Sequence, residues 1–110
     1  MNPFDIYAFA YQWKTSSDRR PWLILEQHGV LWGCFPFSTK AYSGHSVEID
    51  ENHPDFPATG LAESCYLYDD TIVDIPAGVI QSAEASRKGR LENELLNYVL
   101  TETGLEHLHP

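Results

Sequence analysis

Hydrophobic and polar residues alternate or form short runs over the first three quarters of the chain, which predicts β-structure. Residues 6–13 alternate as an extended segment with an aromatic face made of Tyr7, Phe9, Tyr11 and Trp13. Further strands are expected at residues 22–25, 30–37, 45–49, 64–68 and 71–75, and one more between residues 79 and 88. A polar loop at 14–19, a turn at 27–29 and a long surface loop at 50–60 separate them.

The hydrophobic period becomes helical only near the C-terminus. Leu96, Val99, Leu100 and Thr103 share one stripe, which predicts a helix over residues 92–103, with Asn93 as its cap and Gly104 as its stop. Residues 105–110 then form a tail. Several short strands followed by one helix favour a mainly β fold with a C-terminal α-helix, built as one small β-barrel domain over residues 1–110.

Composition supports a folded protein without a membrane segment. The 110 residues are 43% hydrophobic and 13% aromatic, which is enough to bury a core. The longest uncharged stretch, residues 27–39, is too short for a membrane span, and residues 1–13 lack the pattern of a signal peptide. We therefore expect a cytoplasmic protein with no membrane partner, in which Cys34 and Cys65 are reduced thiols in the core.

The charge is strongly negative but unevenly distributed. Sixteen acidic and seven basic residues give a net charge of −9, which argues against a general nucleic-acid-binding surface. All the basic residues lie in windows 14–40 and 87–90, and none lies between residues 41 and 86. A fold that gathers Lys14, Arg19, Arg20 and Lys40 would carry one positive patch on an acidic body; the alternative is ordinary surface charge.

The sequence lacks the common signatures of cofactor and metal enzymes. It has no glycine-rich phosphate loop, no GxSxG motif and no CxxC pair, and the five histidines do not have ligand spacing on the predicted helix. We predict neither a metal site nor a cofactor.

Two segments carry candidate phosphate chemistry: RRPWLIL at residues 19–25 and CFPFSTK at residues 34–40. Pro21 holds Arg20 extended, so its guanidinium can present several donors to a phosphate, and neighbouring strands would bring the Ser38 and Thr39 hydroxyls close. Such a set suits the charge that develops when an RNA 2′-hydroxyl attacks its own phosphate. The alternative is a surface arginine paired with Asp18 and hydroxyls that cap a turn.

The order of short motifs resembles the PemK/MazF-like toxins of bacterial toxin–antitoxin modules over nearly the whole chain. The motifs are FDIYAFAYQW, RRPWLIL, PFST at 36–39, HSVEI, Gly60 followed by Ser64 to Asp69, and Gly89-Arg90-Leu91 before the final helix. The resemblance implies an SH3-like barrel and a homodimer with a cognate antitoxin. It also implies sequence-selective, metal-independent cleavage of single-stranded RNA.

The resemblance also implies residue roles. Arg20 takes the place of the catalytic arginine and Ser38 that of the catalytic threonine or serine, with Thr39 as the adjacent hydroxyl. His28 and His45 titrate in a useful range and are candidate acids or bases. The expected RNA-binding residues are Lys14, Arg19 and Lys40, with Trp13 as a platform for base stacking.

Two alternatives stay open. The first is a non-catalytic, acidic binding module on the same barrel, which binds a basic protein or mimics nucleic acid and draws on the base-free span 41–86. The second is a gyrase-poisoning toxin with the same barrel, which would act through the C-terminal helix.

Overall fold

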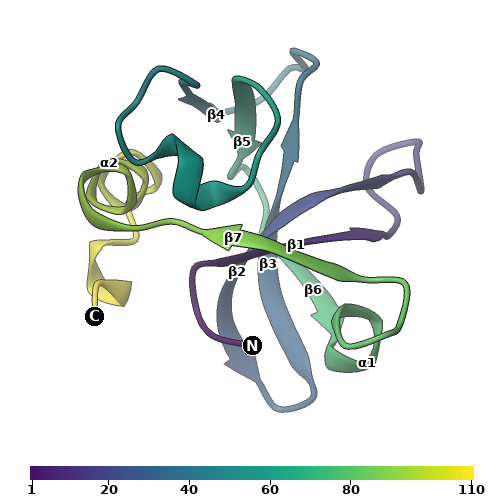
Figure 1. Ribbon diagram of the computed structural model, residues 1–110. Coiled ribbons are helices and arrows are strands. Elements are labelled where there is room, and N and C mark those ends of the chain that lie inside the picture. Colours follow the sequence, from purple (N-terminus) through teal and green to yellow (C-terminus); the bar gives the residue numbers. More distant parts are fainter.

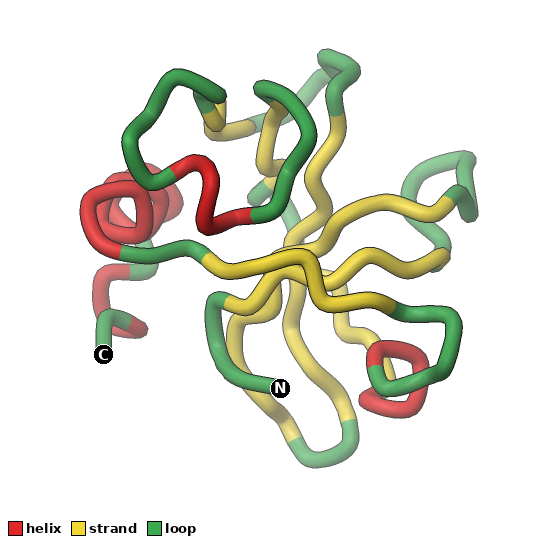
Figure 2. Tube along the Cα trace, viewed as in Figure 1, coloured by secondary structure: helices red, strands yellow, loops and turns green.

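The computed structural model describes all 110 residues and is mainly β, as the hydrophobic pattern predicts (Figure 1). Its strands are β1 (Asp5–Ala10), β2 (Arg19–His28), β3 (Leu31–Ser38), β4 (Ser46–Ile49), β5 (Cys65–Tyr68), β6 (Val73–Pro76) and β7 (Ser86–Arg90). The helices are the short α1 (Ala77–Ile80) and the longer α2 (Asn93–Thr103), with 3-10 turns η1 (Phe56–Thr59) and η2 (Glu106–Leu108) (Figure 2).

All strand pairs are antiparallel, and the sheet branches at β3. The order is β4-β5-β3-β2-β1-β7, and β6 also pairs with β3. The first half of β3, from Leu31 to Cys34, pairs with β6, whereas Phe37 and Ser38 pair with β5. The two ends of the order, β4 and β7, do not pair with each other, so the sheet does not close by strand pairing and the barrel expected from the sequence is not confirmed.

Both faces of the central strands are covered, which explains why residues 21–25 of β2 and 31–37 of β3 form continuous apolar runs. Leu23, Leu25, Phe35 and Phe37 belong to the larger core cluster, which also contains the buried residues of α2. Trp22, Ile24, Trp32 and Cys34 point the other way, into a smaller cluster with Phe9 and with Ile80 of α1. Tyr7, Tyr11 and Trp13 pack against the smaller cluster, so the predicted aromatic face serves the core.

The first two strands have other limits than predicted. β1 ends at Ala10 instead of extending to Trp13, because Trp13 and Ser16 exchange backbone hydrogen bonds (2.9 and 3.1 Å) in a tight turn where Lys14 has φ +54°. β2 extends beyond residues 22–25 at both ends, so Gln27 and His28 are strand residues that pair with Trp32 and Leu31. The exposed ends of β2 continue the ladder without hydrophobic side chains, so the hydrophobic pattern does not indicate them.

Two predictions for the second half of the chain are wrong in part. The strand expected between residues 79 and 88 is instead the helix α1 with a following turn, and β7 begins only at Ser86. Only Gly89 is buried in β7, so the strand has no apolar alternation. The loop 50–60 contains η1, whose Phe56 and Thr59 are buried, so it is not merely a surface loop.

The C-terminal helix lies where it is predicted, at Asn93–Thr103, and Gly104 ends it with φ 72°. Its cap differs from the prediction: Glu92 occupies the N-cap position, and Asn93 has φ 53°. A carboxylate oxygen of Asp55 accepts a hydrogen bond from the backbone N–H of Leu95 (3.3 Å). An acceptor distant in sequence therefore satisfies a donor in the first turn of α2.

Two glycines let the η1 segment lie directly against β7. A Cβ atom at Gly89 would lie 2.1 Å from the carbonyl oxygen of Ala58, and one at Gly60 would lie 1.9 Å from that of Lys88. Gly60 also has φ +69°, which side chains disfavour. The η1 segment therefore packs against the backbone of β7 with no room for a side chain at either glycine.

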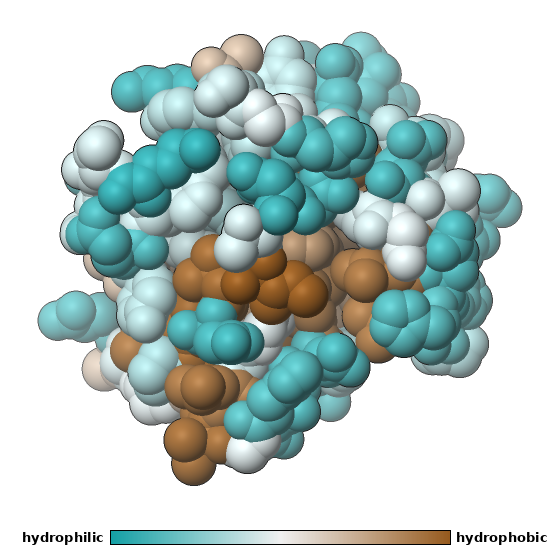
Figure 3. All heavy atoms as spheres, turned by 180° about the vertical axis from the view of Figure 1, so that it is seen from behind, coloured by the Kyte–Doolittle hydropathy of each residue, from teal (hydrophilic) through white to brown (hydrophobic).

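The face opposite to the view of Figure 1 carries an apolar area. Figure 3 shows this patch of hydrophobic residues, surrounded by hydrophilic ones. The most exposed large aliphatic side chains in the structure are Val30 (77% exposed) and Ile72 (47%). No helix has both the length and the apolar character of a transmembrane span.

The close approach of η1 and β7 yields a stability prediction. Gly89→Ala should destabilise the fold by about 1–3 kcal/mol, because the added methyl group can be accommodated only by a backbone shift. The matched control is Gly78→Ala in α1, where a Cβ atom has no neighbour within 4 Å; it should be neutral or stabilise by up to about 1 kcal/mol. Urea denaturation of both variants measures this, and equal stabilities would contradict it.

Candidate functional site

The candidate site forms where β2 and β3 separate. The last residues that pair between them at this end are Trp22 and Pro36, and neither Pro21 nor Pro36 has an N–H that could extend the ladder. Arg20 stays paired with Phe9 of β1, whereas Ser38 pairs with Tyr66 of β5. The two strands therefore diverge (Figure 1). The space between them is a pocket of about 380 Å³.

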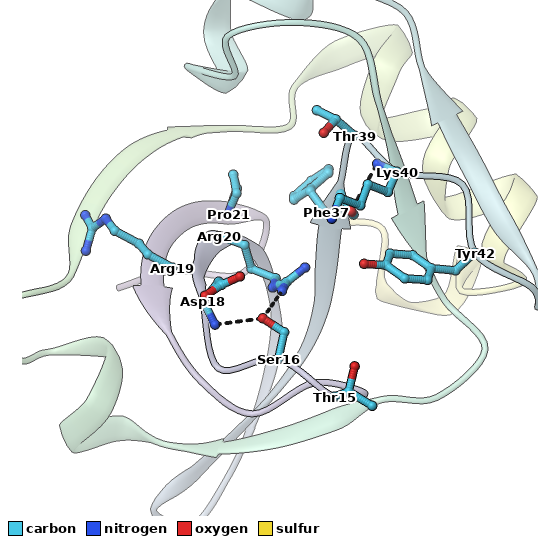
Figure 4. A pocket seen from close by; sticks show the side chains of 11 residues that line it. Thr15, Ser16, Asp18, Arg19, Arg20, Pro21, Phe37, Thr39, Lys40 and Tyr42 are labelled. Atoms are coloured by element: carbon cyan, nitrogen blue, oxygen red, sulfur yellow. Dashed lines mark hydrogen bonds between the residues drawn. The ribbon is translucent and has the colours of Figure 1, made fainter.

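The pocket brings together most of the predicted phosphate-binding residues (Figure 4). β2 contributes Arg20 and Pro21, β3 contributes Phe37 and Ser38, and the segment after β3 contributes Thr39, Lys40 and Tyr42. The loop before β2 and its first residue complete the lining with Thr15, Ser16, Asp18 and Arg19. Arg20, Ser38, Thr39 and Lys40, which come from separate sequence segments, thus share one concave site.

Arg20 is half-buried and has no carboxylate partner. Its Cζ atom lies 4.9 Å from the centroid of the Trp13 ring, and its Nη2 donates a hydrogen bond to Ser16 Oγ (3.3 Å). None of the ion pairs in the structure involves Arg20. The ion pair with Asp18, which was the alternative to a phosphate-binding role for this arginine, is therefore not formed. Its Nε atom is buried without an acceptor. The bond to Ser16 is the one hydrogen bond that the guanidinium makes, so Nη donors remain unused for an anion.

The segment that carries the pocket hydroxyls is fixed by a buried phenol. The hydroxyl of Tyr68 donates to the carbonyl of Lys40 (2.7 Å) and accepts from the N–H of Tyr42 (2.7 Å). The N–H of Lys40 in turn donates to Ser38 Oγ (3.2 Å). Tyr68 is only 1% exposed, so its two bonds are partly buried, whereas the bond between Lys40 and Ser38 is exposed. Together the three bonds fix the conformation of residues 38–42.

Of the four cations expected in one patch, Arg19, Arg20 and Lys40 line the pocket. The Lys14 ammonium does not line it and lies 5.2 Å from the ring centroid of Trp13, which also contacts Arg20, and 5.5 Å from that of Tyr42. The Arg19 guanidinium instead points away (Figure 4) and donates to the carbonyl of Glu84 and to Ser86 Oγ. Successive side chains of a strand point to opposite faces, so Arg19 and Arg20 serve different surfaces.

Trp13 holds the site together and does not present an open face. Its ring centroid lies 5.2 Å from those of Tyr42 and Tyr68, in addition to its contacts with Lys14 and Arg20. A base could stack on Trp13, as the sequence suggested, only by displacing one of these neighbours. The ring is therefore placed to position the Arg20 guanidinium.

Neither histidine proposed as an acid or base lines the pocket. His28 lies at the opposite end of β2 from Arg20, and its Nε2 is 3.3 Å from Glu26 Oε1. His45 Nδ1 is 2.6 Å from Asp69 Oδ1, next to the start of β4. In contrast, Asp18 lines the pocket, and its N–H donates to Ser16 Oγ (3.0 Å). The sequence pattern indicates Asp18 only as a possible ion-pair partner of an arginine and not as a residue of the pocket.

The cysteines are structural, as predicted. Cys34 and Cys65 are buried and free. Burial raises the pKa of both thiols to about 12, with a further rise from Asp74 beside Cys34 and Glu63 beside Cys65. Both are therefore neutral at physiological pH. No group of three or more His, Cys, Asp or Glu side chains is arranged to hold a metal ion.

Comparison with known proteins adds no family assignment. No protein-family model matches the chain, and no curated protein matches it significantly. The similarity to PemK/MazF-like toxins therefore stays a prediction based on the motifs quoted above.

The contact between His45 and Asp69 yields a pH prediction. The hydrogen bond that the His45 ring donates to Asp69, together with the negative charge of Asp69, raises the pKa of His45 above the usual value of about 6.5. The stabilisation from this pair is fully present below the pKa of an unfolded histidine and is lost as pH rises through the higher folded pKa. An NMR titration should show the raised pKa in the wild type and a lower one in Asp69→Asn. The same pKa in both proteins would contradict the assignment.

Proposed function

We propose that the chain is a metal-independent, sequence-selective endoribonuclease that cuts single-stranded RNA, and that it is the toxin of a bacterial toxin–antitoxin module. The observation that carries the proposal is the position of Arg20, without an ion pair, in the same pocket as the Ser38 hydroxyl. In this proposal the branched open sheet is an SH3-like barrel of the PemK/MazF type. The active form is a homodimer that a cognate antitoxin inhibits.

The pocket suits transfer of an RNA phosphate to its own 2′-hydroxyl. The 2′-oxygen attacks phosphorus and the bond from phosphorus to the 5′-oxygen breaks, which yields a 2′,3′-cyclic phosphate and a 5′-hydroxyl end. Arg20 and Lys40 stabilise the negative charge that develops on the phosphorane oxygens. Ser38 Oγ, at the end of β3, donates a hydrogen bond to one of these oxygens.

Asp18 is the proton acceptor that the pocket offers. It is the one carboxylate that lines the pocket, no histidine lines it, and its backbone is bonded to the same Ser16 hydroxyl that contacts Arg20. Asp18 takes the proton from the 2′-hydroxyl, and the leaving 5′-oxygen takes one from solvent, so the protons balance. A carboxylate and a cationic guanidinium that line the same pocket without forming an ion pair provide a base and a charge stabiliser on one short segment.

A second candidate is a non-catalytic module that binds a basic partner. A groove of about 480 Å³ between β4 and α2 is lined by Glu48, Asp50 and Glu94, together with His53, Leu95 and Tyr98. Burial raises the pKa of Tyr98, and the carboxylates of Glu102 and Glu48 add to the rise. This function, like gyrase poisoning, gives Arg20 no catalytic role, so a test on Arg20 separates the candidates.

Arg20→Ala should reduce cleavage of single-stranded RNA by about 100- to 1,000-fold, because the main stabiliser of the phosphorane charge is removed. The matched control is Arg19→Ala, since the Arg19 guanidinium is engaged away from the pocket. Purified proteins are assayed with EDTA present, with an all-deoxy strand that should remain intact and with thermal denaturation to verify folding. No cleavage by the wild type, or equal loss in both variants, would overturn the proposal.

Asp18→Asn should reduce the cleavage rate by about 100- to 10,000-fold while RNA binding is retained, because an amide cannot accept the 2′-hydroxyl proton. Single-turnover rates and affinity for a 2′-O-methyl strand, measured separately, distinguish the two effects. His28→Asn and His45→Asn are the comparison variants and should cleave at wild-type rates. A rate for Asp18→Asn equal to that of the wild type refutes the role of Asp18.

A further inference from the structure

A second cavity adjoins the phosphate pocket across Ser38 and Thr39. It has a volume of about 230 Å³, and Pro21, Phe37, Ser38 and Thr39 line both cavities. The remainder of its wall is Leu61, Ala62, Glu63 and Cys65. The two cavities therefore form one groove with a cationic chamber at Arg20 and a largely apolar chamber in which Glu63 is the one charged residue.

The wall that carries Glu63 is held in place at both ends. At one end, Thr59 Oγ1 donates to the carbonyl of Phe56 (2.7 Å) and accepts from the N–H of Leu61 (3.1 Å). At the other, Ser64 Oγ accepts from the N–H of Glu51 (2.8 Å), and a carboxylate oxygen of Glu51 accepts from the N–H of Ser64 (3.0 Å). The segment is thus shaped before any ligand enters, which favours specific binding.

We propose that this second cavity binds the guanine base of the nucleotide whose phosphate lies at Arg20, with Glu63 bonded to its Watson–Crick edge. The proposal rests on the RNA site of the proposed function. The cavity is below the roughly 300–1,000 Å³ of a drug-sized site, and its apolar walls suit one flat ring system. Single-stranded RNA offers its bases unstacked, so their edges are accessible.

A carboxylate discriminates between the bases because it only accepts hydrogen bonds. Guanine presents two adjacent donors, the N1–H and the 2-amino group, and can bind both oxygens. Adenine and cytosine present an amino group beside a ring nitrogen acceptor, and the N3–H of uracil lies between two carbonyl oxygens. Each of these acceptors would face the carboxylate unfavourably. Guanine should therefore bind more tightly than the other bases by roughly fivefold to a hundredfold.

The test uses three nucleotide probes that cannot be cleaved: guanosine, inosine and adenosine 3′-monophosphates. Inosine lacks only the 2-amino group of guanine. NMR titration of the full chain should show tighter binding of the guanosine probe, with shifts at the amides of Leu61, Glu63 and Cys65. In Glu63→Gln the preference for guanosine over inosine should fall to about one. The matched control, Glu26→Gln, removes the same charge from an exposed residue outside the groove and should retain the preference.

Three results would overturn the guanine assignment: no saturable binding of any probe, equal binding of guanosine and adenosine probes, or an unchanged preference in Glu63→Gln. The outcome is independent of cleavage. Selective binding that depends on Glu63, in a chain that does not cut RNA, refutes the nuclease and leaves the base site standing. Cleavage that depends on Arg20 but shows no guanine preference in binding or at the cut site refutes only the base site.

Discussion

The end of the β2–β3 ladder is the constraint on which the candidate site depends. If the register of Trp22 and Pro36 continued, Arg20 would face Ser38 directly within the sheet, and side chains opposite each other lie only about 5 Å apart. A nucleotide could not enter between them. Pro21 and Pro36 have no N–H to donate to such a ladder. At this end β2 stays paired with β1, whereas β3 pairs with β5. The same divergence opens the pocket and keeps its two key side chains close.

The surroundings of Arg20 differ from those of an arginine that stabilises the fold. Asp5 is 2% exposed, and its carboxylate lies 3.3 Å from the Arg87 guanidinium, which compensates the buried negative charge. Arg20 is instead placed by the Trp13 ring and the Ser16 hydroxyl, neither of which carries a negative charge. Its positive charge is therefore not neutralised within the chain. In the proposed function, the RNA phosphate supplies the negative charge that the fold does not place beside Arg20.

The sequence predicts the elements that hydrophobic side chains define and fails where backbone contacts decide. The final helix and the interiors of β2 and β3 follow from apolar periodicity. The start of β7 and the ends of β2 do not, because their exposed residues contribute mainly backbone bonds. Arg20, Ser38 and Lys40 were identifiable from Pro21 and the hydroxyl run after β3. The phenol of Tyr68, the cap by Asp55 and the wall with Glu63 depend on pairings distant in sequence, which no local pattern contains.

The acidic body is compatible with an RNA site because charge acts over a limited range. At physiological ionic strength the Debye length is about 8 Å, so a phosphate at Arg20 interacts mainly with the nearby Lys14 and Lys40 and only weakly with distant carboxylates. The net charge of −9 mainly slows the approach of RNA over other surfaces. Glu63 applies the same principle within the groove: its charge opposes a strand unless the base offers donors that compensate it. In the proposed base site, the negative charge of Glu63 thus selects the base, beside a phosphate site that requires the positive charge of Arg20.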